Sequence, residues 1–141
     1  MNYFDYVYRV RYADTDKMNV SYYANYLVWF EAARTEYFRA LGYAYTRCEE
    51  QGYYLPVREA MANYQAPSTY DDPLIVRTSV AEMTRTSLRF EYIVLHAETQ
   101  KTLATGYTLH VFVDRTLKPC RIPEFIRSIV TPFKLLSGDT R

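Results

Sequence analysis

The chain has 141 residues and a formal net charge of +1, a size that suits one domain and a charge that argues against a dedicated nucleic-acid-binding protein. No apolar run reaches the length of a membrane span, and the N-terminus lacks the basic-then-apolar pattern of a signal peptide. We therefore expect a cytoplasmic protein with no membrane span and no nucleic-acid partner. Cys48 and Cys120 lack a CxxC partner and the two histidines are isolated, so we expect free thiols and no metal site.

Residues 3–12 alternate between two kinds of side chain. One side of the segment is apolar or aromatic, and the other carries Asp5, Arg9 and Arg11. The apolar side consists of Phe4, Tyr6, Tyr8, Val10 and Tyr12. A period of two predicts a half-buried strand.

Two carboxylates, Asp14 and Asp16, follow this strand and precede the longest predicted helix. A carboxylate that faces a helix N-terminus can attack or deprotonate, and the unpaired N–H groups of that helix can hold a developing negative oxygen. This arrangement suits acyl transfer and needs no metal and no organic cofactor. The alternative is an ordinary turn in which both Asp side chains accept hydrogen bonds from the local backbone.

Residues 25–41 predict a helix, with Asn25 as the N-cap and Gly42 as the stop. Its apolar residues occupy more than one face, so we expect a curved sheet or a neighbouring subunit to wrap it. Arg34 lies within the apolar sector, three residues after Glu31. We expect Arg34 either to pair with Glu31 or to extend along the surface to solvent.

The rest of the chain predicts strands joined by short loops. A Gly-containing loop leads to an extended segment at 55–65, and a turn-rich break at 66–73 leads to three alternating strands at 74–80, 88–94 and 107–113. The short loops at 83–86 and 98–101 predict antiparallel hairpins. A short helix is expected at 124–130, and residues 137–141 are expected to fray. These elements indicate an α+β fold in which one helix covers one sheet face, so another chain hides the other face or it stays wet.

The run YADTDKMNVSYYANYLVWFEAAR at residues 12–34 resembles the 4-hydroxybenzoyl-CoA thioesterase family of hotdog-fold enzymes. It is most similar to the bacterial acyl-CoA thioesterases that include the Tol-Pal-associated member. Weaker matches follow in the same order at 64–72, 84–92 and 104–114. The resemblance covers the chain up to about Pro123.

The resemblance implies a hotdog fold, a curved antiparallel sheet wrapped around one long central helix. It implies a single domain at 1–134 followed by a flexible tail at 135–141. It also implies an acyl-CoA substrate and a homo-oligomer, a dimer or a homotetramer, with active sites at the subunit interface. Asp16 matches the family Asp that acts as nucleophile or general base, and the peptide N–H that polarises the thioester carbonyl falls at Tyr23.

Further substrate contacts are expected around these two residues and along the later strands. Arg85 and Arg89 are candidates for the CoA phosphates. The complete set of expected substrate-binding residues is Tyr22, Asn25, Tyr26, Val57, Arg58, Arg85, Ser87 and Arg89. His110 lies on a strand pattern and is expected to be a core histidine rather than a catalytic one. The 16 tyrosines predict a tyrosine-rich core and subunit interface, an aromatic-lined acyl pocket, or both.

Two positions depart from the family pattern. Asn19 stands where the family usually has glycine, and asparagine is the next best residue for a turn with positive φ. Tyr23 stands where close relatives often carry histidine. These departures motivate an alternative, a non-hydrolytic hotdog protein that binds acyl-CoA or acyl-carrier-protein thioesters. A third hypothesis is a scaffolding oligomer with a tyrosine-rich surface.

Overall fold

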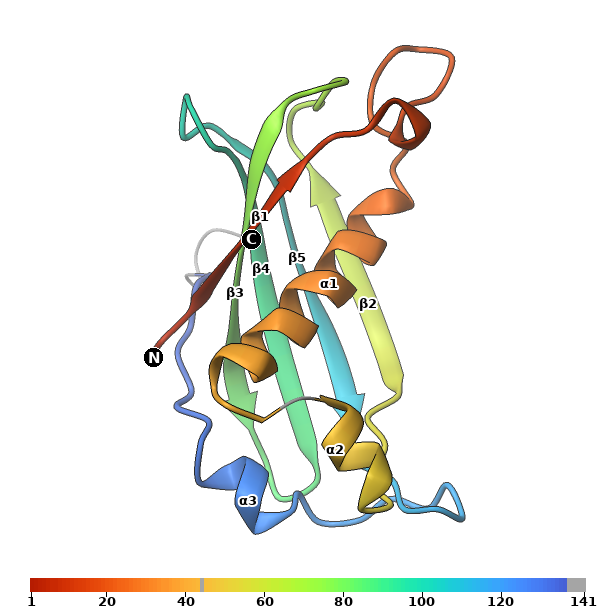
Figure 1. Cartoon of the computed structure of the whole chain (residues 1–141), viewed down its shortest axis with the longest axis vertical. Coiled ribbons are helices and arrows are strands. Elements are labelled where there is room, and N and C mark those ends of the chain that lie inside the picture. Colours follow the sequence, from red (N-terminus) through yellow and green to blue (C-terminus); the bar gives the residue numbers. More distant parts are fainter. Residues whose placement is uncertain (44, 137–141) are drawn as a thin grey trace.

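The computed structural model describes residues 1–43 and 45–136. Its sheet contains five antiparallel strands in the order β1-β3-β4-β5-β2, and the helix α1 crosses one face of it (Figure 1). The strands are β1 (Phe4–Arg9), β2 (Val57–Tyr64), β3 (Pro73–Met83), β4 (Ser87–His96) and β5 (Thr102–Val111), and the helices are α1 (Asn25–Ala40), α2 (Tyr45–Glu50) and α3 (Glu124–Arg127). This confirms the predicted α+β arrangement with two antiparallel hairpins.

Helix α1 forms the centre of the core. Its buried side chains recur at helical spacing and are Tyr26, Trp29, Phe30, Ala33, Tyr37 and Phe38. The ring of Phe30 stacks on Tyr92 of β4, with 4.2 Å between the centroids. Gly106 of β5 permits this close approach, because a Cβ there would lie 2.7 Å from the Phe30 ring and 2.4 Å from the backbone oxygen of Met61.

The predicted stop of α1 is correct and the predicted cap is wrong. Gly42 adopts the left-handed conformation, with φ of 89°, directly after the last turn. At the other end the N-cap residue is Ala24, and Asn25 is the first helical residue. The Asn25 amide donates instead to the backbone oxygen of Asp14 at 2.8 Å, because the preceding loop folds back against the helix start.

Three further features depart from the sequence predictions. Strand β1 ends at Arg9, and a 3-10 turn (Tyr12–Asp14) follows it, so Tyr12 is exposed rather than part of the apolar strand face. Helix α2 occupies the segment that we expected to be a loop. On β5 the buried face carries Ala104, Thr108 and His110, whereas the alternating apolar residues lie on the other, only partly buried face.

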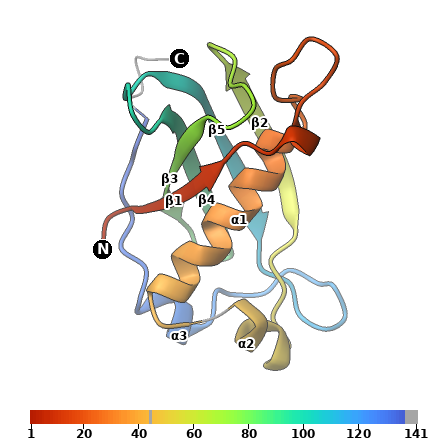
Figure 2. The same ribbon diagram turned by 45° about the horizontal axis from the view of Figure 1, so that its top comes forward.

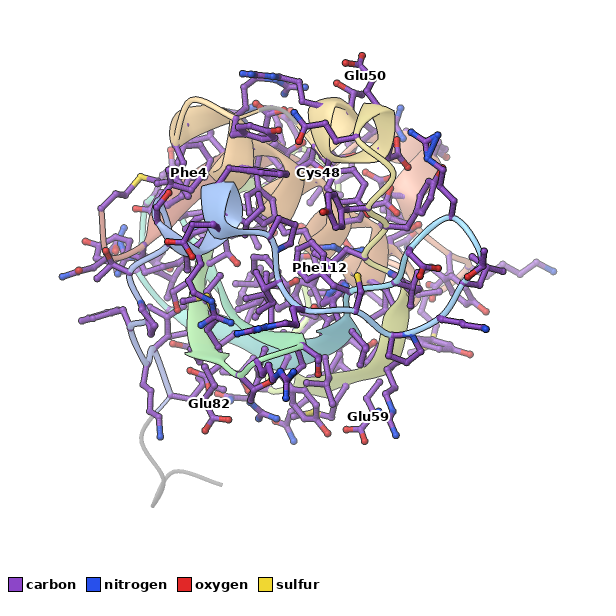
Figure 3. The ribbon with its side chains drawn as sticks, turned by 90° about the horizontal axis from the view of Figure 1, so that it is seen from below. Phe4, Cys48, Glu50, Glu59, Glu82 and Phe112 are labelled. Atoms are coloured by element: carbon purple, nitrogen blue, oxygen red, sulfur yellow. The ribbon has the colours of Figure 1, made fainter. Side chains whose placement is uncertain are left out.

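The outer face of the sheet is partly covered by the chain's own C-terminal segment. The Phe133 N–H donates to the backbone oxygen of Val80, and the N–H groups of Leu135 and Leu136 donate to the buried carboxylate of Glu91 at 3.0 and 3.1 Å. The chain itself thus covers part of the face that was expected to be hidden by another chain or to stay wet, although Glu82 still projects from it (Figure 3).

Helix α3 is shorter than the predicted 124–130 helix. The domain boundary at residue 134 stays a prediction, and the predicted frayed end at 137–141 lies outside the described residues. Within the part of the chain that the structure describes, no helix is both long and apolar enough to span a membrane.

Candidate active site

Asp14 fastens the first loop to the start of α1. Its side chain is buried and accepts hydrogen bonds from the Tyr8 hydroxyl at 2.6 Å and the Arg11 N–H at 2.8 Å. Its backbone oxygen accepts from the Tyr22 N–H and from the Asn25 amide, both at 2.8 Å. The other carboxylate oxygen, Oδ1, lies 3.5 Å from the Arg11 guanidinium, so the contacts of Asp14 give this carboxylate a structural role.

Asp16 lies on a tight turn that leaves most of its carboxylate available. The Asp16 N–H donates to the Val20 oxygen, and the Asn19 N–H donates to the Asp16 oxygen, both at 2.9 Å. Asn19 has φ of 65°, which confirms the predicted left-handed residue in this turn. The side-chain oxygen Oδ1 accepts from the Met18 N–H at 2.8 Å. Among the described residues, Oδ2 has no hydrogen-bond donor.

The bond from the Met18 N–H to Asp16 is of the kind expected if Asp14 and Asp16 only formed an ordinary turn, with side chains that accept from the local backbone. A carboxylate has about four acceptor sites, so one bond orients Asp16 without occupying it. The charge of Asp16 is also felt at Tyr22, whose pKa is raised by its hydrogen bond to Tyr23 and, to a smaller extent, by Asp16. Asp16 therefore lies beside the segment that opens α1.

The amino end of α1 presents open backbone donors. The N–H groups of Tyr26 and Leu27 form short-range bonds to Tyr23 and Ala24, each at 3.2 Å. In contrast, neither Tyr23 nor Ala24 donates its N–H to any described residue, and the N-cap supplies no side-chain bond. Two free N–H groups at the positive end of a 16-residue helix can hold a developing oxyanion.

An aromatic hollow of about 380 Å³ adjoins this helix end. It is lined by Ser21, Tyr23, Tyr26, Tyr64, Ala66 and Pro67 among others, and Asp16 is not part of the lining. Figure 2 shows the loop that carries Asp16 standing at the amino end of α1, near the end of β2. In one chain, the acid and the hollow are thus neighbours rather than parts of a closed pocket.

Residues that the sequence did not single out hold the hollow in shape. The Ser21 and Ser68 hydroxyls lie 2.6 Å apart, and the Tyr26 hydroxyl lies 3.1 Å from Ser68. The Tyr64 hydroxyl donates to the Tyr23 oxygen at 2.9 Å, which ties β2 to the helix end. Tyr64 shares a strand face with Ala60 and Ala62. This alternation was the only feature of the sequence that could have placed Tyr64 on the side of β2 that faces α1.

The other predicted substrate residues are spread over the chain. Tyr22, Asn25 and Tyr26 lie at the helix end, and Val57 lies beside α1 further along. Arg58 is exposed on β2. Their roles in binding stay predictions.

The three predicted substrate-binding residues on β4 and in the loop before it lie away from Asp16. Arg85 and Ser87 are at the far end of β3 and β4, about 30 Å along the strands from the end that Asp16 adjoins. The Arg89 guanidinium lies 3.8 Å from the centroid of the Tyr107 ring, on the outer face of the sheet. One chain alone does not bring these three residues to Asp16.

His110 is a core residue, as predicted. Its Nδ1 lies 3.1 Å from the Leu55 oxygen, and its Nε2 lies 2.8 Å from the Thr108 hydroxyl, which in turn lies 2.7 Å from the Tyr92 hydroxyl. Burial lowers the pKa of His110 to about 4, and the positive charge of Arg34 acts in the same direction. The imidazole is therefore neutral near pH 7.

Among the residues described, no three His, Cys, Asp or Glu side chains are grouped to hold a metal ion. The two thiols, Cys48 and Cys120, are free, and burial raises the pKa of Cys48 to about 11. A thiol with so high a pKa is a poor nucleophile near neutral pH. The candidate chemistry therefore rests on the Asp16 loop and the helix end.

Known proteins are similar to this chain over most of its length. Residues 10–130 match the thioesterase-like superfamily. The acyl-CoA thioester hydrolase YbgC of Escherichia coli is 35% identical over 127 residues, which cover 89% of this chain and 92% of YbgC. A solved DHNA-CoA thioesterase from Staphylococcus aureus has 33% identity and a TM-score of 0.84, and the match covers 91% of this chain and 86% of that chain.

A more distant structure supports the fold alone. A mutant 4-hydroxybenzoyl-CoA thioesterase, complexed with 4-hydroxybenzoyl-CoA, has 20% identity and a TM-score of 0.84. The match covers 93% of this chain and 100% of that chain. The sheet wrapped around α1 is therefore the hotdog fold that the sequence predicts.

Proposed function

This chain belongs to the thioesterase-like superfamily, and we propose that it is an acyl-CoA thioesterase, which hydrolyses a thioester to CoA and a free carboxylic acid. The observation that carries this proposal is that one available carboxylate, Asp16, lies beside the segment that opens α1, where two N–H groups have no partner among the described residues. A thioester is already activated, so a nucleophile or base and an oxyanion site are sufficient.

The chemistry follows from these two groups. The Tyr23 N–H donates to the thioester carbonyl oxygen, and the carbonyl carbon lies before Asp16. The free Oδ2 of Asp16 attacks that carbon, the carbon–sulfur bond breaks, CoA leaves as the thiolate, and water then hydrolyses the mixed anhydride. Alternatively, Asp16 accepts a proton from the water that attacks the carbonyl directly.

A single-turnover reaction in ¹⁸O-labelled water tests for the first route. If Asp16 attacks and water then cleaves the anhydride at the Asp16 carbonyl, ¹⁸O stays in the protein, which identifies Asp16 as the nucleophile. If water cleaves the anhydride at the acyl carbonyl, or if Asp16 acts only as a base, all the label enters the product acid. Mass spectrometry of the peptide that contains Asp16 reads the difference.

The proposal is tested by thiol release from short, long, branched and aromatic acyl-CoAs. We expect hydrolysis of at least one class, and a loss of about 10³-fold or more in kcat for Asp16→Asn with an unchanged unfolding temperature. Glu98→Gln, in the exposed loop between β4 and β5, is the matched control and should keep full activity. Full hydrolysis by a folded Asp16→Asn variant would refute the proposed mechanism. Tight binding of acyl-CoA by the unmodified protein without any turnover would favour the non-hydrolytic alternative.

The active form in this proposal is a homo-oligomer with its sites between subunits. Strand β2 is at the edge of the sheet, and its outer side has no partner strand in residues 1–43 and 45–136. An unpaired edge strand readily recruits another strand. Leu27 and Val28 of α1, next to this edge, expose 40% and 59% of their surface.

Pairing of β2 with β2 of a second copy would cover this edge and complete the open hollow at the helix end. Sedimentation should therefore give a dimer, or a tetramer built from dimers, whereas Val28→Glu should shift it toward monomer and lower activity. A fully active monomer would refute this part of the proposal. We also propose that the protein is cytoplasmic, as predicted from the sequence. The two free thiols support this location, because thiols stay reduced in the cytoplasm.

A further inference from the structure

Two hollows extend along α1 beyond its catalytic end, and both are lined by Glu31, Arg34 and Val57. One has a volume of about 260 Å³ and adds Leu27 and Ala60 to its walls. The other has a volume of about 370 Å³ and continues toward the C-terminal half of the helix. Because they share three lining residues, they form one trough, with mainly apolar walls and with Arg34 between its two parts.

The charge of Arg34 is not neutralised within the chain. The side chain is half-buried, and in the part of the chain that the structure describes it forms no ion pair. Of the two predicted outcomes, pairing with Glu31 is therefore not observed. Glu31 is exposed, so water screens its charge.

The groups behind Arg34 are neutral dipoles. The chain of hydrogen bonds from Leu55 through His110 and Thr108 ends at the hydroxyl of Tyr92. The pKa of His110 lies far below its usual range, and burial raises the pKa of Tyr92, so neither group is charged near pH 7. Among residues 1–43 and 45–136, no anion of the inner wall balances the guanidinium, which can therefore attract one from a ligand.

We propose that this trough binds the acyl group, and that Arg34 selects acyl groups that carry a second carboxylate at their far end. The inference rests on the proposed thioesterase function and names its substrate class. Apolar walls suit the methylene chain, and a guanidinium suits a terminal carboxylate because its fork of donors matches both oxygens. The trough thus fits a dicarboxylic acid that is joined to CoA through one of its two carboxyl groups.

The spacing along α1 agrees with this assignment. Leu27, Glu31 and Arg34 are four and three residues apart, so they share one face of the helix, and Tyr23 lies just before the N-cap. The open N–H of Tyr23 and the Cα of Arg34 are 11 residues apart, about 16 Å along the axis. Long side chains on a helix generally lean back toward its amino end, and such a direction for Arg34 would shorten the gap to the length of a medium acyl chain.

The test compares two eight-carbon ligands, suberoyl-CoA and octanoyl-CoA, by calorimetric titration of the Asp16→Asn protein, in which the thioester stays intact. We expect suberoyl-CoA to bind about tenfold more tightly than octanoyl-CoA, because its terminal carboxylate pairs with Arg34. If no cation met that carboxylate, its desolvation would make suberoyl-CoA the weaker ligand. Adding Arg34→Met should abolish the preference and leave octanoyl-CoA binding within about twofold. Arg34→Gln is a second, more polar variant, and Arg39→Met, on the exposed side of the same helix, is the matched control.

Equal or weaker binding of suberoyl-CoA would overturn the inference, as would a preference that survives both Arg34 variants. A loss of dimerisation in these variants with no change in preference would show that Arg34 pairs with a carboxylate of the second copy instead. Failure of the proposed function gives a different result. In that case the Arg34-dependent preference is present, but the unmodified protein releases no CoA from either ligand.

Discussion

The two ends of α1 treat their unpaired backbone groups in opposite ways. At the carboxyl end, the Tyr43 N–H donates to the Phe38 oxygen and the Gly42 N–H donates to the Arg39 oxygen, which is the Schellman pattern. At the amino end, the N-cap residue supplies no side-chain bond, and the N–H groups of Tyr23 and Ala24 stay open. The carboxyl end is completed by backbone bonds of its own residues, and the amino end leaves the donors that the proposed reaction would use.

The two ends also differ in how they are held. The carboxyl end is built by its own few residues, because Gly42 alone supplies the required conformation. The amino end is fixed from outside by Asp14, Ser68 and Tyr64, which come from three separate parts of the chain. An end that leaves its own donors open needs this external support, since each missing cap weakens the helix.

Among changes at the two ends of α1, the largest expected effect comes from removing the open donor. Tyr23→Pro deletes the N–H without breaking a hydrogen bond, because that N–H has no partner among the described residues. We expect kcat to fall by about 10² to 10³-fold, the usual cost of one oxyanion donor. Tyr23→Phe keeps the N–H and should retain near-normal kcat. Equal activity of the folded proline variant would mean that another group holds the oxyanion.

The buried His110, which lies in the core behind α1, should make the free energy of unfolding depend on pH. The pKa of His110 is about 4 in the folded protein and about 6.5 when unfolded, so the unfolded chain binds the extra proton between these values. Stability from this residue is complete above pH 6.5 and is lost as the pH falls toward 4, by about 3 kcal/mol in total.

The His110→Gln variant cannot titrate at this position, so it isolates the contribution of the imidazole. Urea unfolding at pH 7 and pH 4 should show a smaller loss in the variant than in the unmodified protein, by about 3 kcal/mol. Identical losses in the two proteins would show that the imidazole is not held neutral.

The closed end of α1 is tested by Gly42→Ala. No atom lies within 4 Å of the added Cβ, so the cost arises from the left-handed backbone alone, about 1 to 2 kcal/mol of unfolding free energy. Gly42→Asn should cost less, since asparagine tolerates this conformation. Thiol release should be unchanged in both variants, because this end takes no part in the reaction. A loss of activity at full stability would contradict the division between the two ends.

The smallest expected effect comes from closing the open end. Ala24→Asp places a capping carboxylate at the N-cap and should stabilise the protein by about 1 kcal/mol. The same charge occupies the position where the oxyanion develops, so thiol release should fall. Ala24→Ser caps without a charge and should stabilise with a smaller loss of activity. An Ala24→Asp protein that gains both stability and activity would argue against an oxyanion site at this end.

Local sequence determined the elements that depend on near neighbours. The helical spacing of α1, its stop at Gly42, the left-handed Asn19 and the two tight hairpins follow from backbone preferences that act over a few residues. The spacing also singled out Asp14 and Asp16, and the structure shows that Asp14 holds the loop in place. The catalytic role of Asp16 rests on the family resemblance and stays a prediction.

Tertiary contacts decided what the chain pattern leaves ambiguous. The side chains of β5 alternate regularly, so the sequence does not show which face is buried. The packing of His110 against Phe90 and the hydrogen bond between His110 and Thr108 determine it. Asn25 had the chemistry of a cap, but the distant Asp14 oxygen engaged its amide. The trough beside Arg34 requires β2 and β5 to meet α1, and such an arrangement is encoded by the whole fold rather than by any short segment.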